Sequence, residues 1–352
     1  MHNNQILIGD LSIGKKARPF IIAEMSGNHM GSLDRALRIV KEVARTGAQA
    51  IKLQTYTADT MTIDIKSREF YIDDQTSLWN GRSLHELYAE AHTPWEWHAE
   101  IFQYARSLGL LPFSTPFDET AVDFLEDLGV SLYKIASFEN TDLDLIYKVA
   151  STGKPVIISA GMASISEISE AVLTARDAGC KDLIILKCTS SYPALPEDAN
   201  LLSIPHLREL FKCQVGLSDH TLGIGVSLAA IAHGATVIEK HVTLSRGDGA
   251  VDSLFSMEPN DLMQLVQESE TVRLSLGSIK YGFSKRENLS VSHRRSLYIV
   301  SDLKQGDVIT TQNLRAIRPG LGLAIKFRSE LLGKRVNKDI ARGTPASWDL
   351  FG

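Results

Sequence analysis

Cysteine is scarce in this chain, and its few cysteines form no recognisable pattern. The 352 residues include three cysteines, Cys180, Cys188 and Cys213, which is an odd number without a CxxC pair. A disulfide framework is therefore not expected, and reduced thiols in a reducing cytoplasm fit this composition. Cys188 lies inside an apolar run, so we expect a buried core thiol at this position.

Long apolar runs and a large excess of one charge are also missing. No apolar run reaches the roughly 20 residues that span a bilayer. The first residues, MHNNQILIGDLSIGKK, lack the basic start and long apolar core of a signal peptide. The formal net charge of -5 gives no reason to expect the basic face that binds nucleic acid. We therefore expect a cytoplasmic protein that binds neither membrane nor nucleic acid.

The chain does contain a repeated pattern of short apolar runs, each of which stops at a polar residue able to do chemistry. The eight runs end at Glu24; Lys52 and Gln54; Ser114 and Thr115; Lys134 and Ser137; Ser159; Lys187 and Thr189; Ser218 and His220; and His241. Most runs are separated by stretches with helical periodicity, which indicates a strand and a helix repeated eight times. This pattern predicts an α/β fold, a (β/α)8 TIM barrel whose strand-end side chains gather at one mouth.

The length of the chain leaves room for a second domain, since a barrel of this kind takes about 250 residues. We predict a barrel over 1–280, a polar linker over 281–293 and a small β-rich domain over 294–352, where short β-like runs alternate with turn signals. The segment 57–92 interrupts the βα rhythm. We expect this insertion to form part of the wall or lid over the barrel mouth.

Two histidines are predicted to end the last two strands of the barrel. Neighbouring strands lie about 4.8 Å apart, so His220 and His241 can reach one metal ion. The alternative is a hydrogen-bonded pair without metal, but Asp219 and Asp252 nearby in sequence favour a metal site. Imidazole with carboxylate or water suits Mn²⁺, Zn²⁺ or Fe²⁺. Because no thiolate ligand is evident, an exchangeable Mn²⁺ or Mg²⁺ is as credible as a tightly held zinc ion.

Two lysines, Lys52 and Lys134, end strands inside otherwise apolar sequence. A buried ammonium needs an anion. That anion is either a carboxylate such as Glu24 or Glu139, or a bound ligand, and a Schiff-base lysine is a further alternative. Hydroxyls bind phosphate without adding charge, and several accompany the lysines, so we favour phosphate and carboxylate binding: Ser137, Ser159, Thr189 and Ser218. Glu24 itself is a candidate metal ligand, general base or acceptor for a sugar hydroxyl.

These strand ends and their surroundings are similar to a known family. IIAEMSGNHMGS, IKLQTYT, FSTPFD, YKIASFEN, KCTSSYP, GLSDHT and IEKHVTL together resemble the sialic acid synthases (nonulosonate synthases). That family condenses phosphoenolpyruvate with an open-chain six-carbon amino sugar. RRSLYIVSDLKQGDVITTQNLRAIRPG resembles the antifreeze-like (SAF) domain that follows the barrel in the family. TYTADTMT and LWNGRSLHELYAEAHTPWEWH are most similar to the pseudaminic acid synthase branch, rather than the N-acetylneuraminate or legionaminate branches.

The resemblance implies roles for individual residues. It implies a divalent metal, Mn²⁺ or Mg²⁺, on His220 and His241, and catalytic roles for Glu24, Asp252 and Lys52. The implied substrate-binding residues are Gln54, Thr115, Lys134, Ser137, Ser159, Ser218 and Arg318, with Lys52 also in the phosphoenolpyruvate set. Arg318 would enter the active site of a partner subunit, which implies a domain-swapped homodimer. The other function classes considered are a metal-dependent aldolase or epimerase and a non-catalytic sugar-binding protein, because barrels host many chemistries.

Overall fold

The computed structural model describes residues 5–75 and 77–352. The chain divides into two compact units, Met1–Gly277 and Ser278–Gly352. The limits predicted for the linker, 281–293, stay a prediction. Among the described residues, no helix combines the length and the apolar character needed to cross a membrane.

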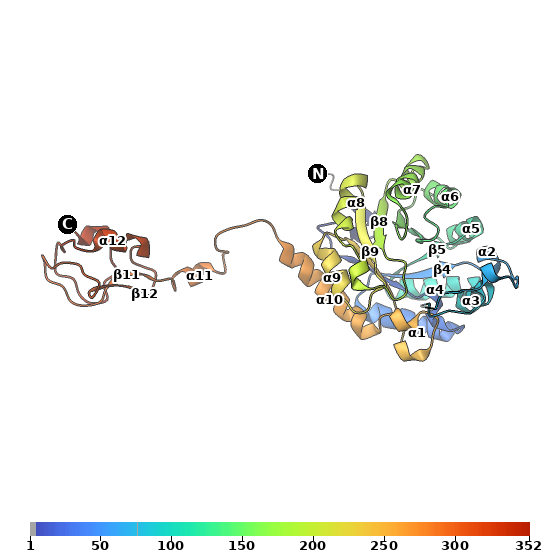
Figure 1. Ribbon diagram of the computed structural model, residues 1–352, viewed down its shortest axis with the longest axis horizontal. Coiled ribbons are helices and arrows are strands. Elements are labelled where there is room, and N and C mark those ends of the chain that lie inside the picture. The colour runs from blue at the N-terminus through green and yellow to red at the C-terminus, as the bar shows by residue number, and fades with distance from the viewer. Residues whose placement is uncertain (1–4, 76) are drawn as a thin grey trace. The chain divides into compact units, whose positions relative to one another are not determined.

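The first unit is built on a closed barrel of eight parallel strands, which confirms the predicted fold (Figure 1). The strands pair in sequence order from β3 to β10, and β10 pairs with β3 to close the barrel. Their bounds are β3 Phe20–Glu24, β4 Ala50–Thr55, β5 Leu111–Pro116, β6 Tyr133–Ile135, β7 Val156–Ser159, β8 Leu183–Cys188, β9 Gln214–Ser218 and β10 Val237–His241. Because all strands run the same way, their carboxyl ends meet at one mouth.

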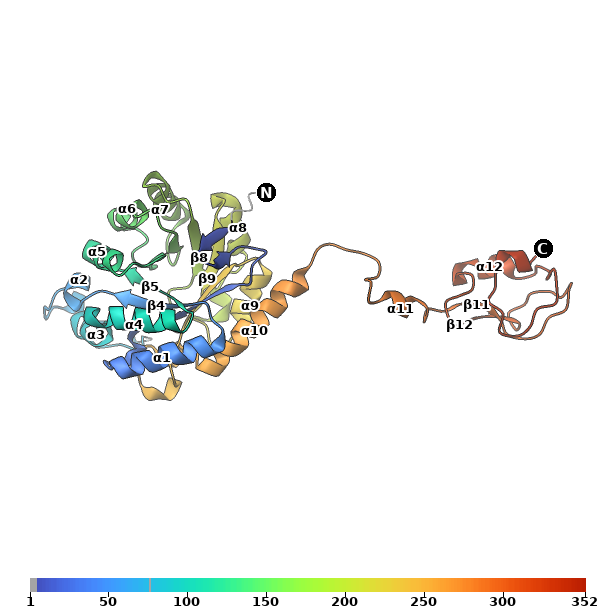
Figure 2. The same ribbon diagram turned by 180° about the vertical axis from the view of Figure 1, so that it is seen from behind.

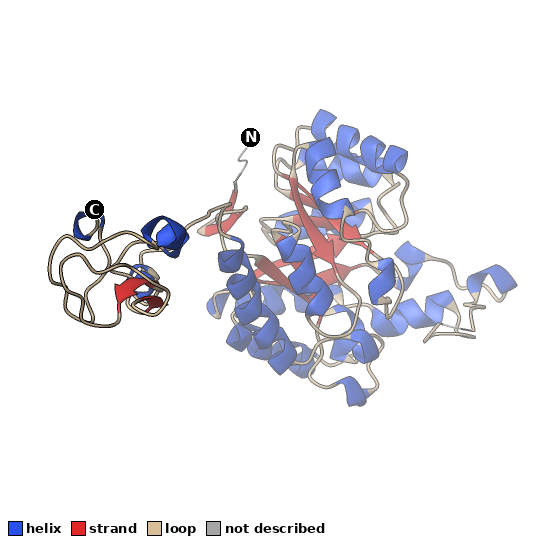
Figure 3. Ribbon diagram, turned by 60° about the vertical axis from the view of Figure 1, so that its left-hand side comes forward, coloured by secondary structure: helices blue, strands red, loops and turns tan. Residues whose placement is uncertain are grey.

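Helices surround the strands, as Figure 3 shows with blue helices outside the red barrel. They are α1 Leu33–Thr46, α4 Trp95–Ser107, α5 Glu119–Asp127, α6 Leu143–Ser151, α7 Ile165–Asp177, α8 Ser203–Phe211, α9 Gly225–Ala232 and α10 Pro259–Leu276. Helix α1 shows why these segments are helical: the Ser32 side chain accepts the Arg35 N–H at its start, and Gly47 ends it at a φ of 83°. Short 3-10 helices follow several strands: η1 Ser26–His29, η3 Pro196–Asp198, η4 Arg246–Asp248 and η5 Ser253–Phe255.

One predicted helix start was displaced by a residue. The sequence predicts Thr93 as N-cap with Pro94 as the first helical residue, but Pro94 is the N-cap and α4 begins at Trp95. The Thr93 hydroxyl instead lies 3.3 Å from Nε2 of His29, in the buried loop after β3. The Thr93 hydroxyl therefore makes a contact with a distant segment instead of capping the helix.

The barrel interior has two layers of different chemistry. Its amino-terminal part is apolar and includes Phe20, Ile22, Phe113, Ile157 and Val237. The N-terminal hairpin, β1 Ile6–Ile8 and β2 Leu11–Ile13, packs three buried isoleucines into the same cluster (dark blue in Figure 2). Polar side chains can therefore gather only at the other end, because the apolar layer and the hairpin fill this one.

The insertion after β4 contains α2 Ala58–Met61, η2 Arg68–Phe70 and α3 Leu84–Ala91. Trp79 connects it to the loop after β10, since its Nε1–H donates to the Val251 carbonyl at 3.1 Å. The Trp79 ring also lies 6.0 Å from that of Tyr192, which follows β8. These contacts at loops that follow strands support the predicted role as part of the wall of the mouth.

The second unit is a small domain with its own core. It pairs β11 Ser296–Ile299 with β12 Leu314–Ile317 in antiparallel fashion. Short helices complete it: α11 Asn288–Val291, η6 Ile325–Phe327, α12 Arg328–Leu331 and η7 Trp348–Leu350. Its apolar side chains, among them Leu297, Ile299 and Leu331, are buried against one another. This agrees with the predicted small β-rich domain.

Candidate active site

A buried carboxylate, Glu239, is the centre of the ion pairs at the barrel mouth. Its Oε1 lies 3.8 Å from Nζ of Lys52 and 3.7 Å from Nζ of Lys134, and it accepts a 3.2 Å hydrogen bond from Ser218. Lys52 also contacts the carboxylate of Glu24. The sequence analysis overlooked Glu239, although it stands two residues before His241 in VIEKH and therefore points to the same side of the strand.

Burial and mutual charge act against one another on the pKa values of this cluster. Burial alone would raise the pKa of Glu239, but Lys134 and Lys52 outweigh it and the pKa is lowered. Burial would likewise lower the pKa of Lys52, but Glu239 and Glu24 raise it. The pKa of Glu24 rises to about 7, chiefly because the carboxyl is buried, while Lys52 opposes the rise. Burial, with the neighbouring charge of Lys52, lowers the pKa of Lys134, while Glu239 opposes this. The mouth thus holds two lysines around one carboxylate, and a second carboxyl that titrates near neutrality.

Hydroxyl groups line the same layer. Thr115 accepts a 3.0 Å hydrogen bond from Lys52 Nζ, and Ser137 accepts a 2.8 Å bond from Ser190. The hydroxyl of Ser159 is buried and has no hydrogen-bond partner among the described residues. Half-buried Gln54 is level with Thr115 on the neighbouring strand. An unsatisfied buried hydroxyl at the end of a barrel strand suits an anionic ligand.

The two predicted metal-binding histidines lie together at the mouth. The ring centroids of His220 and His241 are 5.3 Å apart, and both residues are buried. Nδ1 of His220 lies 2.9 Å from the Thr189 carbonyl, which assigns a proton to that nitrogen. Burial would lower the pKa of His220, but its hydrogen bond to Cys188 and the bond to Thr189 raise it. Nδ1 of His241 has no hydrogen-bond partner among the described residues and lies 3.6 Å from an Asp252 oxygen.

These residues fit a cation held by few protein ligands. Burial, followed by the neighbouring His220, lowers the pKa of His241 well below its usual value, so its imidazole is neutral and can bind a metal. No group of three or more histidine, cysteine, aspartate or glutamate side chains within 5–75 and 77–352 converges as a metal cluster. Two imidazoles with one approaching carboxylate suit an exchangeable ion that keeps water or substrate oxygen as its other ligands.

Ser26 connects the lysine cluster to the histidine pair. Its backbone N–H donates to Glu24 at 2.8 Å, and its hydroxyl donates to Asp252. Ser26 has a φ of 46°, in the left-handed region that costs a residue with a side chain about 1 kcal/mol or more. That conformation lets one residue bind both carboxylates. Burial raises the pKa of Asp252 to about 6, so the two acids have similar proton affinities.

Further side chains at the mouth were not predicted as site residues. The rings of Tyr192 and Phe255 lie 4.4 Å from His220 and 5.0 Å from His241, respectively. Glu139, considered only as a partner for the two buried lysines, is largely buried, and burial raises its pKa to about 7. These residues sit in loops after strands, where the period-two pattern of a strand no longer tells which way a side chain points.

The structure also gives the surroundings of Cys188 and Arg318. Cys188 is buried, as expected of a core thiol, but it lies at the mouth, 3.8 Å from the Ser190 hydroxyl. Arg318 belongs to the second unit, where it is exposed and makes no ion pair or side-chain hydrogen bond to any described residue. Arg318 is thus free to bind a group outside its own unit.

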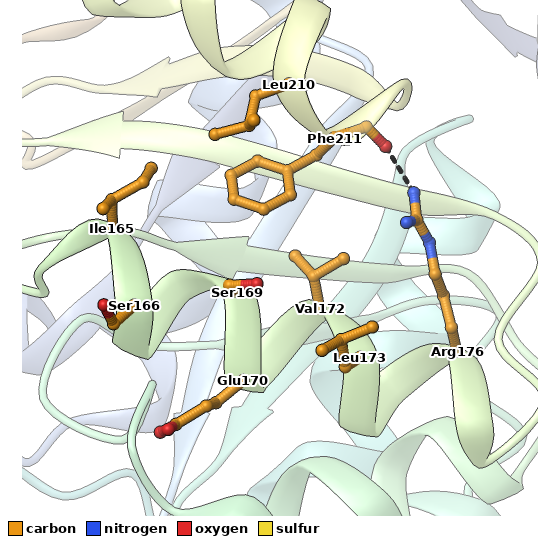
Figure 4. A pocket seen from close by; sticks show the side chains of 9 residues that line it. All are labelled: Ile165, Ser166, Ser169, Glu170, Val172, Leu173, Arg176, Leu210 and Phe211. Atoms are coloured by element: carbon orange, nitrogen blue, oxygen red, sulfur yellow. Dashed lines mark hydrogen bonds between the residues drawn. The ribbon is translucent and has the colours of Figure 1, made fainter.

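A groove on the outside of the barrel is chemically unlike the mouth. It lies between α7 and α8, has a volume of about 620 Å³, and is shown in Figure 4. Its lining is Ile165, Ser166, Ser169, Glu170, Val172, Leu173, Arg176, Leu210 and Phe211. The Arg176 guanidinium in this lining donates to the Phe211 carbonyl. The charged residues of the lining are Glu170 and Arg176, and Arg176 is already bound to the Phe211 carbonyl. The groove therefore lacks the cluster of reactive groups found at the barrel mouth.

Comparison with known proteins supports this assignment. The NeuB family model matches residues 39–281, and the SAF domain model matches residues 294–352. The pseudaminic acid synthase of Campylobacter jejuni strain 81-176 is 41% identical over 336 residues, 96% of this chain and 97% of that protein. The one from Helicobacter pylori is 42% identical, over 94% and 97%. The N,N'-diacetyllegionaminic acid synthase of Legionella pneumophila is 35% identical, over 99% of each chain.

A solved structure shows the same relationship. The N-acetylneuraminic acid synthetase of Leptospira borgpetersenii, determined in complex with citrate, superposes with a TM-score of 0.73 at 34% sequence identity. The match covers 83% of this chain and 97% of that one. The resemblance predicted from the strand-end motifs is thereby confirmed, and the chain belongs to the NeuB family and ends in a SAF domain.

Proposed function

We propose that this protein condenses phosphoenolpyruvate with 2,4-diacetamido-2,4,6-trideoxy-altrose to give pseudaminic acid and phosphate. The observation that carries the proposal is the pairing, in one buried mouth, of two lysines around Glu239 with two imidazoles alongside. Higher identity to pseudaminic acid synthases than to the legionaminic acid synthase supports this acceptor sugar.

The lysine side of the mouth is proposed to bind phosphoenolpyruvate. Lys52 and Lys134 would neutralise its phosphate and carboxylate, while hydroxyls supply uncharged donors: Thr115, Ser137, Ser159 and Ser218. Gln54 would contact substrate at the same level. Holding C3 of the enol against the sugar aldehyde lowers the barrier by roughly 7 kcal/mol or more, because two bound reactants no longer need to find each other.

The imidazole side is proposed to receive the open-chain sugar. His220 and His241 would hold Mn²⁺ or Mg²⁺ there, with Asp252 beside them. A bound divalent cation supplies Lewis acidity toward the aldehyde oxygen. As C3 attacks the aldehyde carbon, C2 gains oxocarbenium character and water adds to it. Phosphate then leaves by cleavage of the C–O bond.

A carboxylate is needed to orient or deprotonate that water, and two are available. Glu24 contacts Lys52 on the phosphoenolpyruvate side, whereas Asp252 lies near His241. We assign the role to Glu24 because the water attacks carbon C2 of phosphoenolpyruvate.

This assignment predicts a pH profile. The base acts when ionised, so kcat/KM should fall as the pH drops through about 7, the pKa of Glu24. Glu24→Gln should lower kcat by about 10²- to 10⁴-fold and abolish the fall of kcat/KM at acidic pH. If Asp252 is the base, Asp252→Asn will abolish the fall of kcat/KM at acidic pH, and the Glu24→Gln variant will still show it.

Arg318 is proposed to reach the acceptor sugar in the partner subunit of a domain-swapped homodimer. Arg318→Ala should raise the acceptor KM about 10- to 100-fold and leave the phosphoenolpyruvate KM within twofold, since one charge-assisted hydrogen bond is lost. Arg315→Ala, an exposed arginine on β12, is the control. An unchanged acceptor KM and kcat would reject this role.

The domain swap itself can be tested by mixing two impaired variants at an acceptor concentration well below the raised KM. A dimer of one Arg318→Ala subunit and one Lys52→Met subunit contains one intact site if each Arg318 serves the other barrel. Exchanging the subunits should therefore restore activity well above that of either variant. No recovery after confirmed exchange would contradict the swap.

We also propose a cytoplasmic location, which suits three cysteines that form no disulfide.

The reaction is tested by running it in ¹⁸O-labelled water with Mn²⁺. Phosphate should be released only when both phosphoenolpyruvate and the acceptor are present, and the label should appear at C2 of the nine-carbon acid. Label in the phosphate alone would mean P–O cleavage and would reject the mechanism. Release without any acceptor would reject the condensation.

A further inference from the structure

A second buried ion pair lies directly behind the two histidines. Nζ of Lys240 is 3.1 Å from Oδ2 of Asp219, and each side chain is 1% exposed. Asp219 immediately precedes His220, and Lys240 immediately precedes His241. Because strand side chains alternate, Lys240 points away from the barrel axis while Glu239 and His241 point into it. The pair therefore does not belong to the mouth itself.

Every polar side-chain atom of this pair is hydrogen-bonded, and most of these bonds hold the loop after β9. Lys240 donates to the Thr221 carbonyl at 2.6 Å and to the Gly223 carbonyl at 3.1 Å. Oδ1 of Asp219 accepts from the Thr221 N–H at 2.9 Å and from its hydroxyl at 2.7 Å. Oδ2 also accepts a 2.6 Å bond from Ser227 in α9. The backbone on both sides of His220 is thereby tied to the strand that carries His241.

Stability alone does not account for such a pair. A buried ion pair costs two desolvations, and apolar residues of similar volume often fill the same space at equal or better stability. Apolar side chains cannot form the hydrogen bonds that orient the carbonyls of Thr221 and Gly223 and the N–H of Thr221. A directional anchor matters most for a neighbouring group that needs a defined orientation, and the His220 imidazole is the neighbour here.

We infer that Asp219 and Lys240 are positioning residues that set the separation and orientation of His220 and His241 for a divalent cation. This inference rests on the proposed function, because it assumes that the two imidazoles share a cation. The pair makes no contact with substrate. It acts through the loop Asp219–Gly223 and through the backbone of β10.

The test replaces the pair with neutral side chains of similar shape and measures Mn²⁺ binding without any substrate. Asp219→Asn with Lys240→Met removes both charges together, so neither is left buried and unpaired. We expect Mn²⁺ to bind at least about tenfold more weakly by titration calorimetry. The phosphoenolpyruvate KM, set by Lys52 and Lys134, should stay within twofold, and kcat should recover as Mn²⁺ is raised. Lys154→Met, which breaks an ion pair before β7 at the other end of the barrel, is the matched control.

The outcomes separate this inference from the proposed function. Wild-type Mn²⁺ affinity in the folded double variant would overturn the positioning role alone. A wild-type protein that turns over without binding Mn²⁺ would overturn the shared cation and the positioning role together. If the double variant does not fold, Lys240→Arg keeps the charge but cannot present one nitrogen to three acceptors. It should then weaken Mn²⁺ binding, and an unchanged dissociation constant would reject the inference.

Discussion

His241→Ala is expected to lose Mn²⁺ binding and turnover together. The imidazole is buried, its neutral form is favoured, and its Nδ1 is unpaired among the described residues, so alanine removes one of two proposed nitrogen ligands. Loss of Lewis acid assistance worth several kcal/mol corresponds to a fall in kcat of about 10³-fold or more. Titration with Mn²⁺ and steady-state assays on the same preparation measure both effects.

A nearby histidine serves as the control for this experiment. His233 caps the end of α9 and is exposed, so His233→Ala should leave Mn²⁺ binding and turnover unchanged. Full activity of His241→Ala after metal depletion would contradict the proposed cation site. Activity lost with Mn²⁺ affinity retained would instead assign His241 to substrate binding.

The second large effect is expected from Lys52→Met. This change keeps the length of the side chain but removes the ammonium that contacts Glu24, Thr115 and Glu239. Losing a positioned cation beside a phosphate should lower kcat/KM for phosphoenolpyruvate by about 10²- to 10³-fold. Buried Glu24 loses its ion-pair partner at the same time, and Glu239 keeps only Lys134, which costs stability by about 3 kcal/mol or more.

That stability loss calls for a matched lysine outside the mouth. Lys187 is the penultimate residue of β8 and follows the inward-facing Leu186, so its side chain points away from the barrel interior. Its ammonium donates to the adjacent Cys188 carbonyl at 2.8 Å. Lys187→Met should retain the wild-type kcat/KM. Thermal denaturation of all three proteins separates a folding defect from a lost substrate contact. A folded Lys52→Met enzyme with an unchanged phosphoenolpyruvate KM and kcat would remove Lys52 from the site.

Much of the barrel could be predicted because its signals are local. Short apolar runs, helical stretches ended by residues such as Gly47, and polar strand ends each depend on a few neighbouring residues. Alternation along β10 implied that Glu239 faces inward with His241. The role of Glu239 was not predicted because it depends on contacts with Lys52 and Lys134, which come from β4 and β6.

Contacts between distant segments could not be predicted in this way. Ser26 binds Asp252, 226 positions away, and Trp79 binds the Val251 carbonyl, 172 positions away. Neither contact has a local pattern, because each depends on how two loops fold against one another. The apolar hairpin Ile6–Ile13 gave no sign that it would close the barrel, since short alternating runs at a chain end fit many environments.

The most direct test of the proposed function is a competition between acceptors. The enzyme is incubated with phosphoenolpyruvate, Mn²⁺ and equal concentrations of 2,4-diacetamido-2,4,6-trideoxy-altrose and N-acetylmannosamine, and the nine-carbon acids are identified by mass. We predict pseudaminic acid as the main product, with phosphate released in equal amount. N-acetylneuraminate as the main product would contradict the assigned acceptor, and no nine-carbon acid from either sugar would contradict the condensation itself.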